Sequence, residues 1–264
     1  MPLTTDAVLR LVQQVAAEVV TPRFRTLAES EIDEKRPGDL VTVADREAEE
    51  LLTAALLEAY PDAVVLGEEA HAGDEDLLRR FREADHGFTV DPVDGTKNFV
   101  QGSPDHAVMV SEVREGEAVR GWIWQPEHEV AWVAERGSGV RRNGELVVRQ
   151  PAGPQPRGAT SIWSRRGRQP VGLPALRGSW VCCGIDYPRM LEGEADYLIY
   201  GHTNAWDHLP GSLMTREAGG AVAHRDGTPY TARSEGRGLV VAADAETLRV
   251  VLEACEGIWP RTGS

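Results

Sequence analysis

The chain has 264 residues, of which 41% are hydrophobic and 27% charged, so it is long enough to bury one large core or two closely packed subdomains. Its formal net charge of −14 argues against a nucleic-acid partner, because no basic stripe is present to displace counterions from the phosphates of a nucleic acid. A small phosphate remains compatible with this surplus of carboxylates, since bound divalent cations supply the positive charge that the phosphate needs.

The first part of the chain alternates predicted helices and short strands. Residues 5–20 and 43–59 carry apolar side chains at helical spacing, and Pro61 ends the second segment. The apolar stripe of this second helix consists of Ala44, Ala48, Leu51, Leu52, Ala55, Leu56 and Ala59. The runs AVVLGEE (63–69) and GFTVDPVDG (87–95) are each predicted to form a strand that ends in acidic residues.

The middle of the chain is predicted to be rich in strands. Residues 106–148 alternate β-rich runs with the turn sequences EGE, QPEHE, ERGSG and RNGE, which predicts an antiparallel meander. Residues 150–178 are rich in Pro, Gly and Arg, a composition typical of a subdomain boundary or of a surface loop. We therefore expect an N-terminal α+β subdomain at 1–150 and a C-terminal α/β subdomain at 151–264, packed as one catalytic unit.

The last part of the chain again mixes both types of element. WVCCGID (180–186) is predicted to be a strand and PRMLEGEA (188–195) a short helix. A longer helix is predicted for WDHLPGSLMTREAGG (206–220), followed by a strand near GLVVAA (238–243) and a helix at 245–255. Helices on either side of two β-rich stretches predict a layered α/β sandwich.

Cysteine content and hydropathy bear on the location of the protein. Three cysteines are present, and two of them, Cys182 and Cys183, are adjacent, so a disulfide framework of the secreted kind is not expected. No run of 18 uninterrupted apolar residues occurs in the sequence. We therefore expect a cytoplasmic protein without a membrane partner.

Three separated acidic segments carry the chemical signal: GEE (67–69), DPVDGTKNF (91–99) and WDHLPG (206–211). They supply four hard oxygen donors, Glu68, Asp91, Asp94 and Asp207. Because no cysteine ligand accompanies them, they favour Mg²⁺ or Mn²⁺ over zinc or copper. Two such ions explain the residue types, since one activates a water nucleophile and the other stabilises the leaving alkoxide of a phosphate ester.

A phosphate cradle is predicted directly after Asp94. Gly95 and Thr96 stand where a helix would begin, so their N–H groups are able to point at a phosphate oxygen. Thr96 is a candidate for orienting the water, and Asp45 is the candidate acceptor for its hydroxyl. The alternative interpretation of Asp45, a capping-box residue opposite Thr42, is equally compatible with the sequence.

These motifs, in this order, resemble the inositol monophosphatase family of Mg²⁺-dependent, lithium-sensitive phosphatases, and the resemblance spans most of the chain. It implies a layered αβαβα sandwich of the inositol monophosphatase and fructose bisphosphatase type, often found as a homodimer. It also implies two or three Mg²⁺ ions per site, the first held by Glu68, Asp91 and the Val93 carbonyl. The resemblance assigns a second ion to Asp91, Asp94 and Asp207.

The same resemblance implies further roles. Glu68 and Thr96 would activate water, and Lys35 would lie on a mobile loop that closes over the site. On the substrate side the chain departs from the family, because Ile199 or Tyr200 replaces a glutamate that binds sugar hydroxyls. In VCCGID, Cys182 stands where a serine is common, although Asp186 is retained.

The substrate is therefore left open at the level of the sequence. A small phosphorylated metabolite is expected, but the departures put inositol phosphate in doubt. TKNF (96–99) resembles histidinol-phosphate phosphatases and some nucleotide-directed members, which act on adenosine bisphosphate or NADP. The alternative from another class is a metal-binding regulatory protein without turnover.

Overall fold

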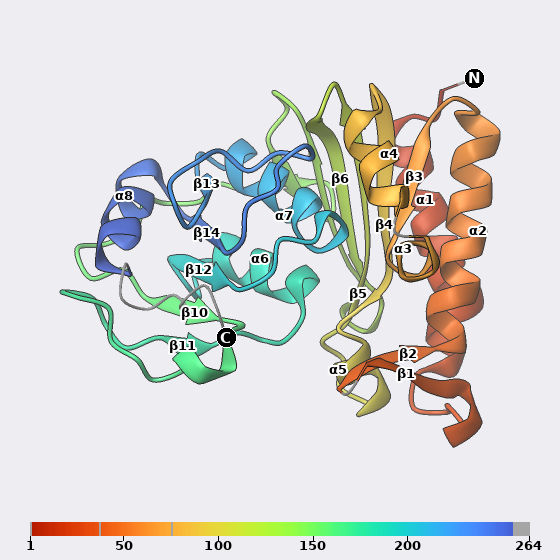
Figure 1. Ribbon diagram of the computed structural model, residues 1–264, viewed down its shortest axis with the longest axis horizontal. Helices are drawn as coiled ribbons and strands as arrows, with labels where there is room; N and C mark the ends of the chain where they lie inside the picture. The colour runs from red at the N-terminus through yellow and green to blue at the C-terminus, as the bar shows by residue number, and fades with distance from the viewer. Residues whose placement is uncertain (1, 37, 75, 256–264) are drawn as a thin grey trace.

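The computed structural model describes residues 2–36, 38–74 and 76–255 and shows five stacked layers (Figure 1). Two helices, a seven-stranded sheet, two further helices, a five-stranded sheet and a final helix follow one another across the molecule. The predicted αβαβα sandwich is therefore confirmed. Residues 256–264, the end of the predicted 151–264 subdomain, lie outside the described residues.

The outer helical layer consists of α1 (Thr5–Val15), extended by helical turns to Arg23, and α2 (Val43–Ala59). Val8, Val12, Leu52 and Leu56 are buried against one face of the large sheet, where each such side chain contributes roughly 1.5–3 kcal/mol. Leu51, a member of the predicted apolar stripe, is 41% exposed. Positions four residues apart form the buried line of α2, and Leu51 lies beside that line.

The seven-stranded sheet has the order β3-β4-β5-β6-β7-β8-β9. Its strands are β3 (Val64–Gly67), β4 (His86–Asp94), β5 (Ala107–Arg114), β6 (Glu117–Gln125), β7 (Val130–Glu135), β8 (Val140–Arg142) and β9 (Glu145–Leu146). The predicted meander is confirmed, since β4 to β9 pair antiparallel. β3 pairs parallel with β4, and α3 (Glu68–Gly73) and α4 (Asp76–Glu83) connect them. Parallel pairing brings the acidic carboxyl ends of both strands to the same edge.

Two small elements flank this edge. A hairpin of β1 (Ile32–Arg36) and β2 (Asp39–Thr42) precedes α2, and α5 (Thr96–Val100) follows β4. Figure 1 places the hairpin and α5 together below the ends of the large sheet. Lys35 of the hairpin therefore comes close to residues that follow β3.

The second sheet has the order β11-β10-β12-β14-β13 and lies beyond the central helices (Figure 1). Its strands are β10 (Gly158–Thr160), β11 (Arg177–Gly178), β12 (Tyr197–Tyr200), β13 (Ala221–His224) and β14 (Leu239–Ala242). Helices α6 (Cys183–Leu191) and α7 (Ala205–Glu217) pack between the two sheets, and α8 (Ala245–Ala254) covers the outer face. The predicted helices at 206–220 and 245–255 and the strand near 238–243 are confirmed.

The predicted strand at 180–186 is wrong, because α6 begins within it at Cys183. The Cys182 carbonyl accepts the N–H groups of Ile185 and Asp186, and the N–H of Gly184 donates to Asp94. Pro188 lacks an N–H for the Gly184 carbonyl, which accepts instead from Gln125 Nε2 at 2.7 Å. Contacts with distant residues thus select a helix where the local pattern indicated a strand.

In the part of the chain that the structure describes, no helix combines the length and the apolar character needed to cross a membrane.

Candidate metal and phosphate site

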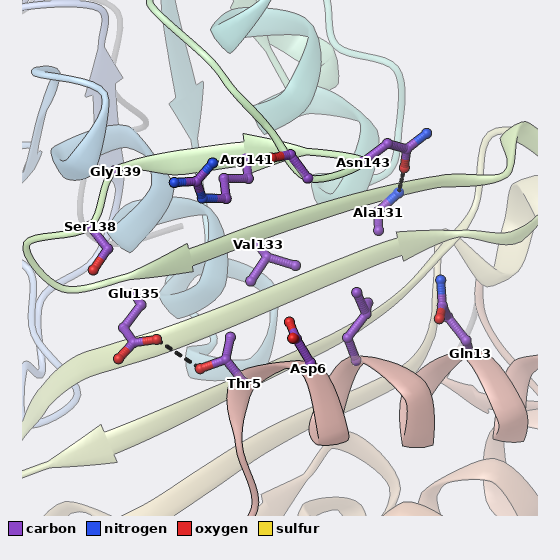
Figure 2. A pocket seen from close by; sticks show the side chains of 12 residues that line it. Thr5, Asp6, Gln13, Ala131, Val133, Glu135, Ser138, Gly139, Arg141 and Asn143 are labelled. Atoms are coloured by element: carbon purple, nitrogen blue, oxygen red, sulfur yellow. Dashed lines mark hydrogen bonds between the residues drawn. The ribbon is translucent and has the colours of Figure 1, made fainter.

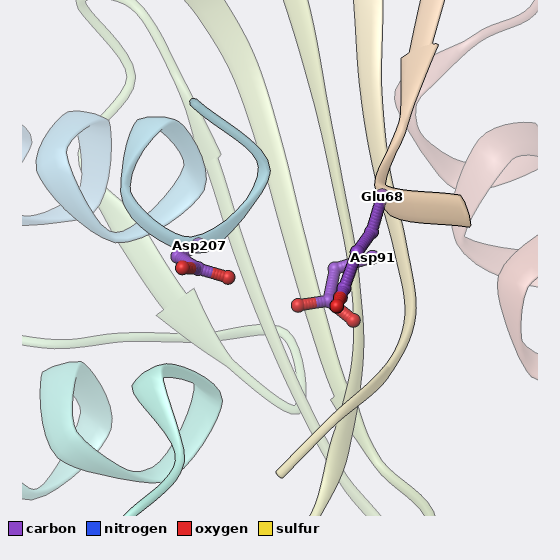
Figure 3. A group of neighbouring side chains, drawn as sticks. All are labelled: Glu68, Asp91 and Asp207. Carbon is purple, nitrogen blue, oxygen red and sulfur yellow. The ribbon is translucent and has the colours of Figure 1, made fainter. Parts of the chain in front are cut away.

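Three carboxylates from separate segments meet at the edge of the large sheet (Figure 3). Glu68 is the first residue of α3, Asp91 lies in β4 and Asp207 lies in the first turn of α7. One oxygen of each lies within 4.8 Å of one oxygen of the others. This geometry brings together donors that are far apart in the sequence.

Electrostatics at this cluster favour a cation. Burial, followed by the charges of Glu68 and Asp94, raises the pKa of both Asp91 and Asp207 well above the usual range. Asp91 Oδ1 is buried and has no hydrogen-bond partner among the described residues. An orphaned buried carboxylate oxygen among other carboxylates fits a hard divalent cation, which would relieve the repulsion.

Asp94 lies at the end of β4 and is held from α6. Its Oδ2 accepts the Cys182 thiol at 2.9 Å and the N–H of Gly184. Burial raises its pKa to about 6 even though these hydrogen bonds oppose the shift. A register shift in β4 between Asp91 and Asp94 interrupts the alternation that would place positions 91 and 94 on opposite faces.

Thr96 has two acceptors within reach. Its Oγ1 lies 3.1 Å from the Val93 carbonyl and 3.3 Å from Asp45 Oδ1. Asp45 Oδ2 accepts the N–H of Thr42 at 2.8 Å and the Thr42 hydroxyl at 2.5 Å, and burial raises the pKa of Asp45 to about 7. Both interpretations of Asp45 thus describe real contacts, because each oxygen serves one of them.

Gly95, between Asp94 and Thr96, has a φ of +82°, which glycine adopts without strain. A Cβ at this position would lie 3.0 Å from the Cβ of Cys182 and 3.2 Å from the Asp105 carbonyl. The absence of a side chain therefore keeps the backbone of the loop close to α6.

Lys35 bridges the two glutamates that follow β3. Its Nζ lies 2.8 Å from Glu68 Oε1 and 2.5 Å from Glu69 Oε1. Burial disfavours the charged form of Lys35 and so acts to lower its pKa. The two neighbouring carboxylates have the larger combined effect, and the pKa of Lys35 is raised. Lys35 lies in strand β1 and not on a loop as expected, and its charge neutralises part of the acidic cluster.

Glu49 is a residue of this region that the sequence analysis missed. Its two carboxylate oxygens accept the N–H groups of Glu69 at 2.8 Å and Ala70 at 2.7 Å, which fixes the first turn of α3. A Cβ on Gly67 would lie 2.2 Å from the Glu49 carboxyl carbon, so the glycine makes room for this contact. The signal in the sequence was its place four residues after Asp45 on the same face of α2.

A pocket of about 200 Å³ adjoins Asp94 and Asp207. Its remaining lining residues are Ser161, Ser179, Val181, Cys182, Cys183, Asp186, Tyr200, His202 and His208. Tyr200 lines this pocket, whereas Ile199 packs in the cluster beneath α8. Asp186 accepts the N–H of Trp180 at 2.7 Å and the Tyr200 hydroxyl at 3.2 Å, and burial raises its pKa to about 7.

A larger hollow of about 420 Å³ lies between α1 and β7–β8 (Figure 2). The carboxylates in its lining are Asp6 and Glu135, and Glu135 accepts a hydrogen bond from Thr5 at 2.8 Å. It lacks the convergent oxygen donors of the smaller pocket. The acidic cluster, and not the volume of a hollow, therefore indicates the position of the candidate site.

The structure combines a five-layered α/β sandwich with carboxylates that gather at a strand edge beside the Gly95 loop. These features are typical of the metal-dependent phosphatases with a sandwich fold. The chain matches the model of the inositol monophosphatase family over residues 3–258. It therefore belongs to this family and is a phosphoric monoester hydrolase, as the order of its motifs predicted.

Individual relatives agree with this membership. An inositol-1-monophosphatase of Mesorhizobium japonicum is 29% identical, covering 96% of this chain and 97% of its own. A Pseudomonas aeruginosa protein named Nus factor SuhB is 26% identical, covering 93% of each chain.

Solved structures agree on the fold. The structure of a Thermotoga maritima IMPase superposes with a TM-score of 0.78 at 23% identity, covering 96% of this chain and 97% of the other. An IMPase/NADP phosphatase complexed with Mg²⁺ and phosphate gives 0.77 at 20% identity, covering 94% and 92%. At these identities the likeness concerns the fold alone.

Proposed function

We propose that the protein is a Mg²⁺-dependent phosphomonoesterase that releases phosphate from a small phosphorylated metabolite by direct attack of water. The observation that carries the proposal is the convergence of Glu68, Asp91 and Asp207 within 4.8 Å. Family membership supports the same reaction class. No covalent phosphoenzyme is required, because water is the nucleophile in such a site.

The residues divide the work as follows. Glu68, Asp91 and the Val93 carbonyl would hold one Mg²⁺, and Asp94 and Asp207 would join Asp91 around a second, with Mn²⁺ as a substitute and a third ion during turnover. When bound, the ions lower the pKa of water and neutralise charge on the phosphate and the leaving oxygen.

The chain itself positions the water and the phosphate. Thr96 orients the water and Glu68 helps to activate it, while Asp45 is the acceptor for the Thr96 hydroxyl. The N–H groups of Gly95 and Thr96, beside Asp94, hold phosphate oxygens. These roles explain why Thr96, whose hydroxyl has two acceptors within reach, follows Asp91 and Asp94 in the sequence.

On the substrate side, Asp186 and Tyr200 would contact the leaving group, and Lys35 would approach from the β1–β2 hairpin. Candidate substrates are inositol phosphates, histidinol phosphate, adenosine 3′,5′-bisphosphate and NADP; one solved structure of the same fold is named an NADP phosphatase. A cytoplasmic homodimer inhibited by lithium belongs to the same proposal, which rests on the family resemblance. The two subdomains, 1–150 and 151–264, would form one catalytic unit, since Asp207 comes from the second.

The test is phosphate release from this panel of substrates with Mg²⁺ and with excess EDTA. Asp94→Asn and Asp207→Asn should each lower kcat by orders of magnitude, because each removes a charge that holds the metal. The matched control is Asp62→Asn, a change at an exposed aspartate that should leave kcat unchanged. Full activity of the unaltered protein in excess EDTA would contradict the proposal.

One observation favours a second role, a regulatory protein that binds metal without turnover. Several relatives are named Nus factor SuhB or putative Nus factor SuhB. Calorimetric Mg²⁺ binding without phosphate release from any member of the panel would favour this role.

A further inference from the structure

Val181 has a backbone conformation that valine rarely adopts. Its φ is +63°, in the left-handed region that β-branched side chains strongly disfavour. Among the described non-glycine residues with positive φ, it is the β-branched member of a set otherwise formed by Arg25, Glu115, Glu129 and Asn143. Its side chain is 47% exposed, so burial does not compensate for the strain.

The neighbours of this valine impose the conformation from both sides. Before it, the N–H of Trp180 donates to Asp186 at 2.7 Å, and the Trp180 carbonyl accepts from Asn98 Nδ2 at 3.1 Å. After it, the thiol of Cys182 donates to Asp94 at 2.9 Å. Strained residues persist where the surroundings over-determine them, and they concentrate at functional sites. Glycine or asparagine would meet the same backbone requirement without this strain.

The side chain of Val181 lines the 200 Å³ pocket together with Asp94, Asp207 and Tyr200. We propose that Val181 is a specificity-determining residue, whose isopropyl group restricts the leaving group to small alcohols and excludes bulky rings by its volume. A ring in this pocket would have to overlap the space that the isopropyl group occupies beside Asp94 and Tyr200. The inference rests on the proposed phosphatase function and adds the size of its substrate.

Two substitutions at this position separate bulk from strain. Val181→Gly removes both the isopropyl group and the strain, whereas Val181→Asn relieves the strain but keeps a side chain of similar size. The measurement is kcat/KM for inositol 1-phosphate relative to glycerol 2-phosphate, with Mg²⁺, together with Tm. We expect Val181→Gly to raise this ratio about tenfold or more, in the range that one altered pocket contact provides.

For Val181→Asn we expect the ratio to stay within about threefold of the unaltered protein, because the pocket keeps its bulk. Both variants should raise Tm by about 2–4 °C, since relief of left-handed strain is a stability effect. The matched control is Glu115→Gly, which relieves a positive φ of +53° in the β5–β6 turn. This control should change Tm in the same direction and leave the ratio unchanged.

An unchanged ratio in Val181→Gly, or an equal increase in Val181→Asn, would overturn the role of Val181 while the phosphatase function stands. Absence of phosphate release by the unaltered protein from both esters and from the wider panel would overturn the proposed function and this inference with it. The two failures are therefore distinguishable within one set of assays.

Discussion

Asp45 connects the start of α2 to Thr96, the residue proposed to orient the water, through two different oxygens. Oδ2 accepts from Thr42 and completes the capping box, while Oδ1 lies 3.3 Å from the Thr96 hydroxyl. A carboxylate fixed by a helix cap loses little freedom when it accepts a further hydrogen bond. The cap therefore pre-organises the group that would orient water.

This arrangement predicts that rate and stability separate at Thr96. Thr96→Val should lower kcat by about 10²- to 10⁴-fold, because the general-base pathway through the hydroxyl is lost, with little effect on Tm. Asp244→Ala is the control: it removes the cap of α8, where Asp244 accepts from Thr247 at 2.7 Å, and should cost about 1 kcal/mol without changing kcat. Wild-type kcat in Thr96→Val would contradict the assignment.

Sequence reasoning was able to single out Glu68, Asp91 and Thr96 because their motifs combine unusual residue types at fixed spacing. It left open whether Ile199 or Tyr200 faces the substrate, since both lie in one apolar run. In β12 neighbouring side chains point to opposite faces, so Tyr200 turns toward the central helices and Ile199 toward α8. Only the position of the strand between two helical layers makes this choice.

Helix α3 depends on a residue from another helix for its first turn. Glu49 is buried, its pKa is raised to about 7 by burial, and it accepts two of the N–H groups that the first turn of α3 would otherwise leave unpaired. Glu68, the preceding side chain, is thereby held at the edge of the sheet.

We predict that Glu49→Ala weakens Mg²⁺ binding by about 10- to 100-fold, as expected when a group that orients a ligand is removed. Calorimetric titration with Mg²⁺ measures this change. The control is Glu50→Ala, which alters the exposed neighbour on the same helix and should leave the affinity unchanged. Equal affinities for the two variants would argue against the role of Glu49.

Helix α6 marks the limit of local prediction. Its first residues, CGI, are an apolar run that is ambiguous between strand and helix, and the preceding VC extends the β-like pattern. Long-range partners decide the outcome, since the Gly184 N–H donates to Asp94 and its carbonyl accepts from Gln125.

The Gln125 contact predicts a stability effect without a direct catalytic one. Gln125→Ala leaves the buried Gly184 carbonyl without its partner and should lower the free energy of unfolding by about 1–3 kcal/mol. Urea denaturation measures this, with the exposed Gln101→Ala as a control expected within about 0.5 kcal/mol of the unaltered protein. Equal midpoints for both variants would show that the Gly184 carbonyl finds another partner.

At the scale of the whole molecule, the acidic cluster joins parts of the chain that belong to different layers. Asp91 lies in the large sheet, Glu68 follows the sheet strand β3 directly, and Asp207 comes from the helix that packs between the sheets. A layered α/β sandwich was predictable from the periodicity, and its αβαβα order only from the family resemblance. The order β11-β10-β12-β14-β13 was not predictable, because short strands carry no signal of their neighbours. The meeting of the carboxylates depends on this packing, so we expect metal binding to stabilise the fold.

The titration of buried carboxyl and imidazole groups determines how the stability of the metal-free protein changes with pH. Burial raises the pKa of four carboxyl groups above their unfolded values, to about 7, 7, 6 and 7 for Asp45, Glu49, Asp94 and Asp186. Each contributes stability that is complete below its unfolded pKa and is lost as pH rises through the folded pKa. Burial lowers the pKa of His106 to about 4 and of His208 to about 3. Their contribution to the stability of the folded protein is therefore lost only as pH falls below about 6.5.

We therefore predict that the metal-free protein gains stability as pH falls from about 8, because the four carboxyl groups take up protons in the folded state, and that the gain per pH unit becomes smaller below about 6.5, where the two histidines oppose it. Mg²⁺ should add most stability at about pH 8, since protons and cations compete for the same carboxylates. Urea unfolding at both pH values, with Mg²⁺ or EDTA, measures this. Asp207→Asn should shrink both effects, because it removes one of the mutually repelling charges. An equal gain from Mg²⁺ at both pH values would mean that the cation binds elsewhere.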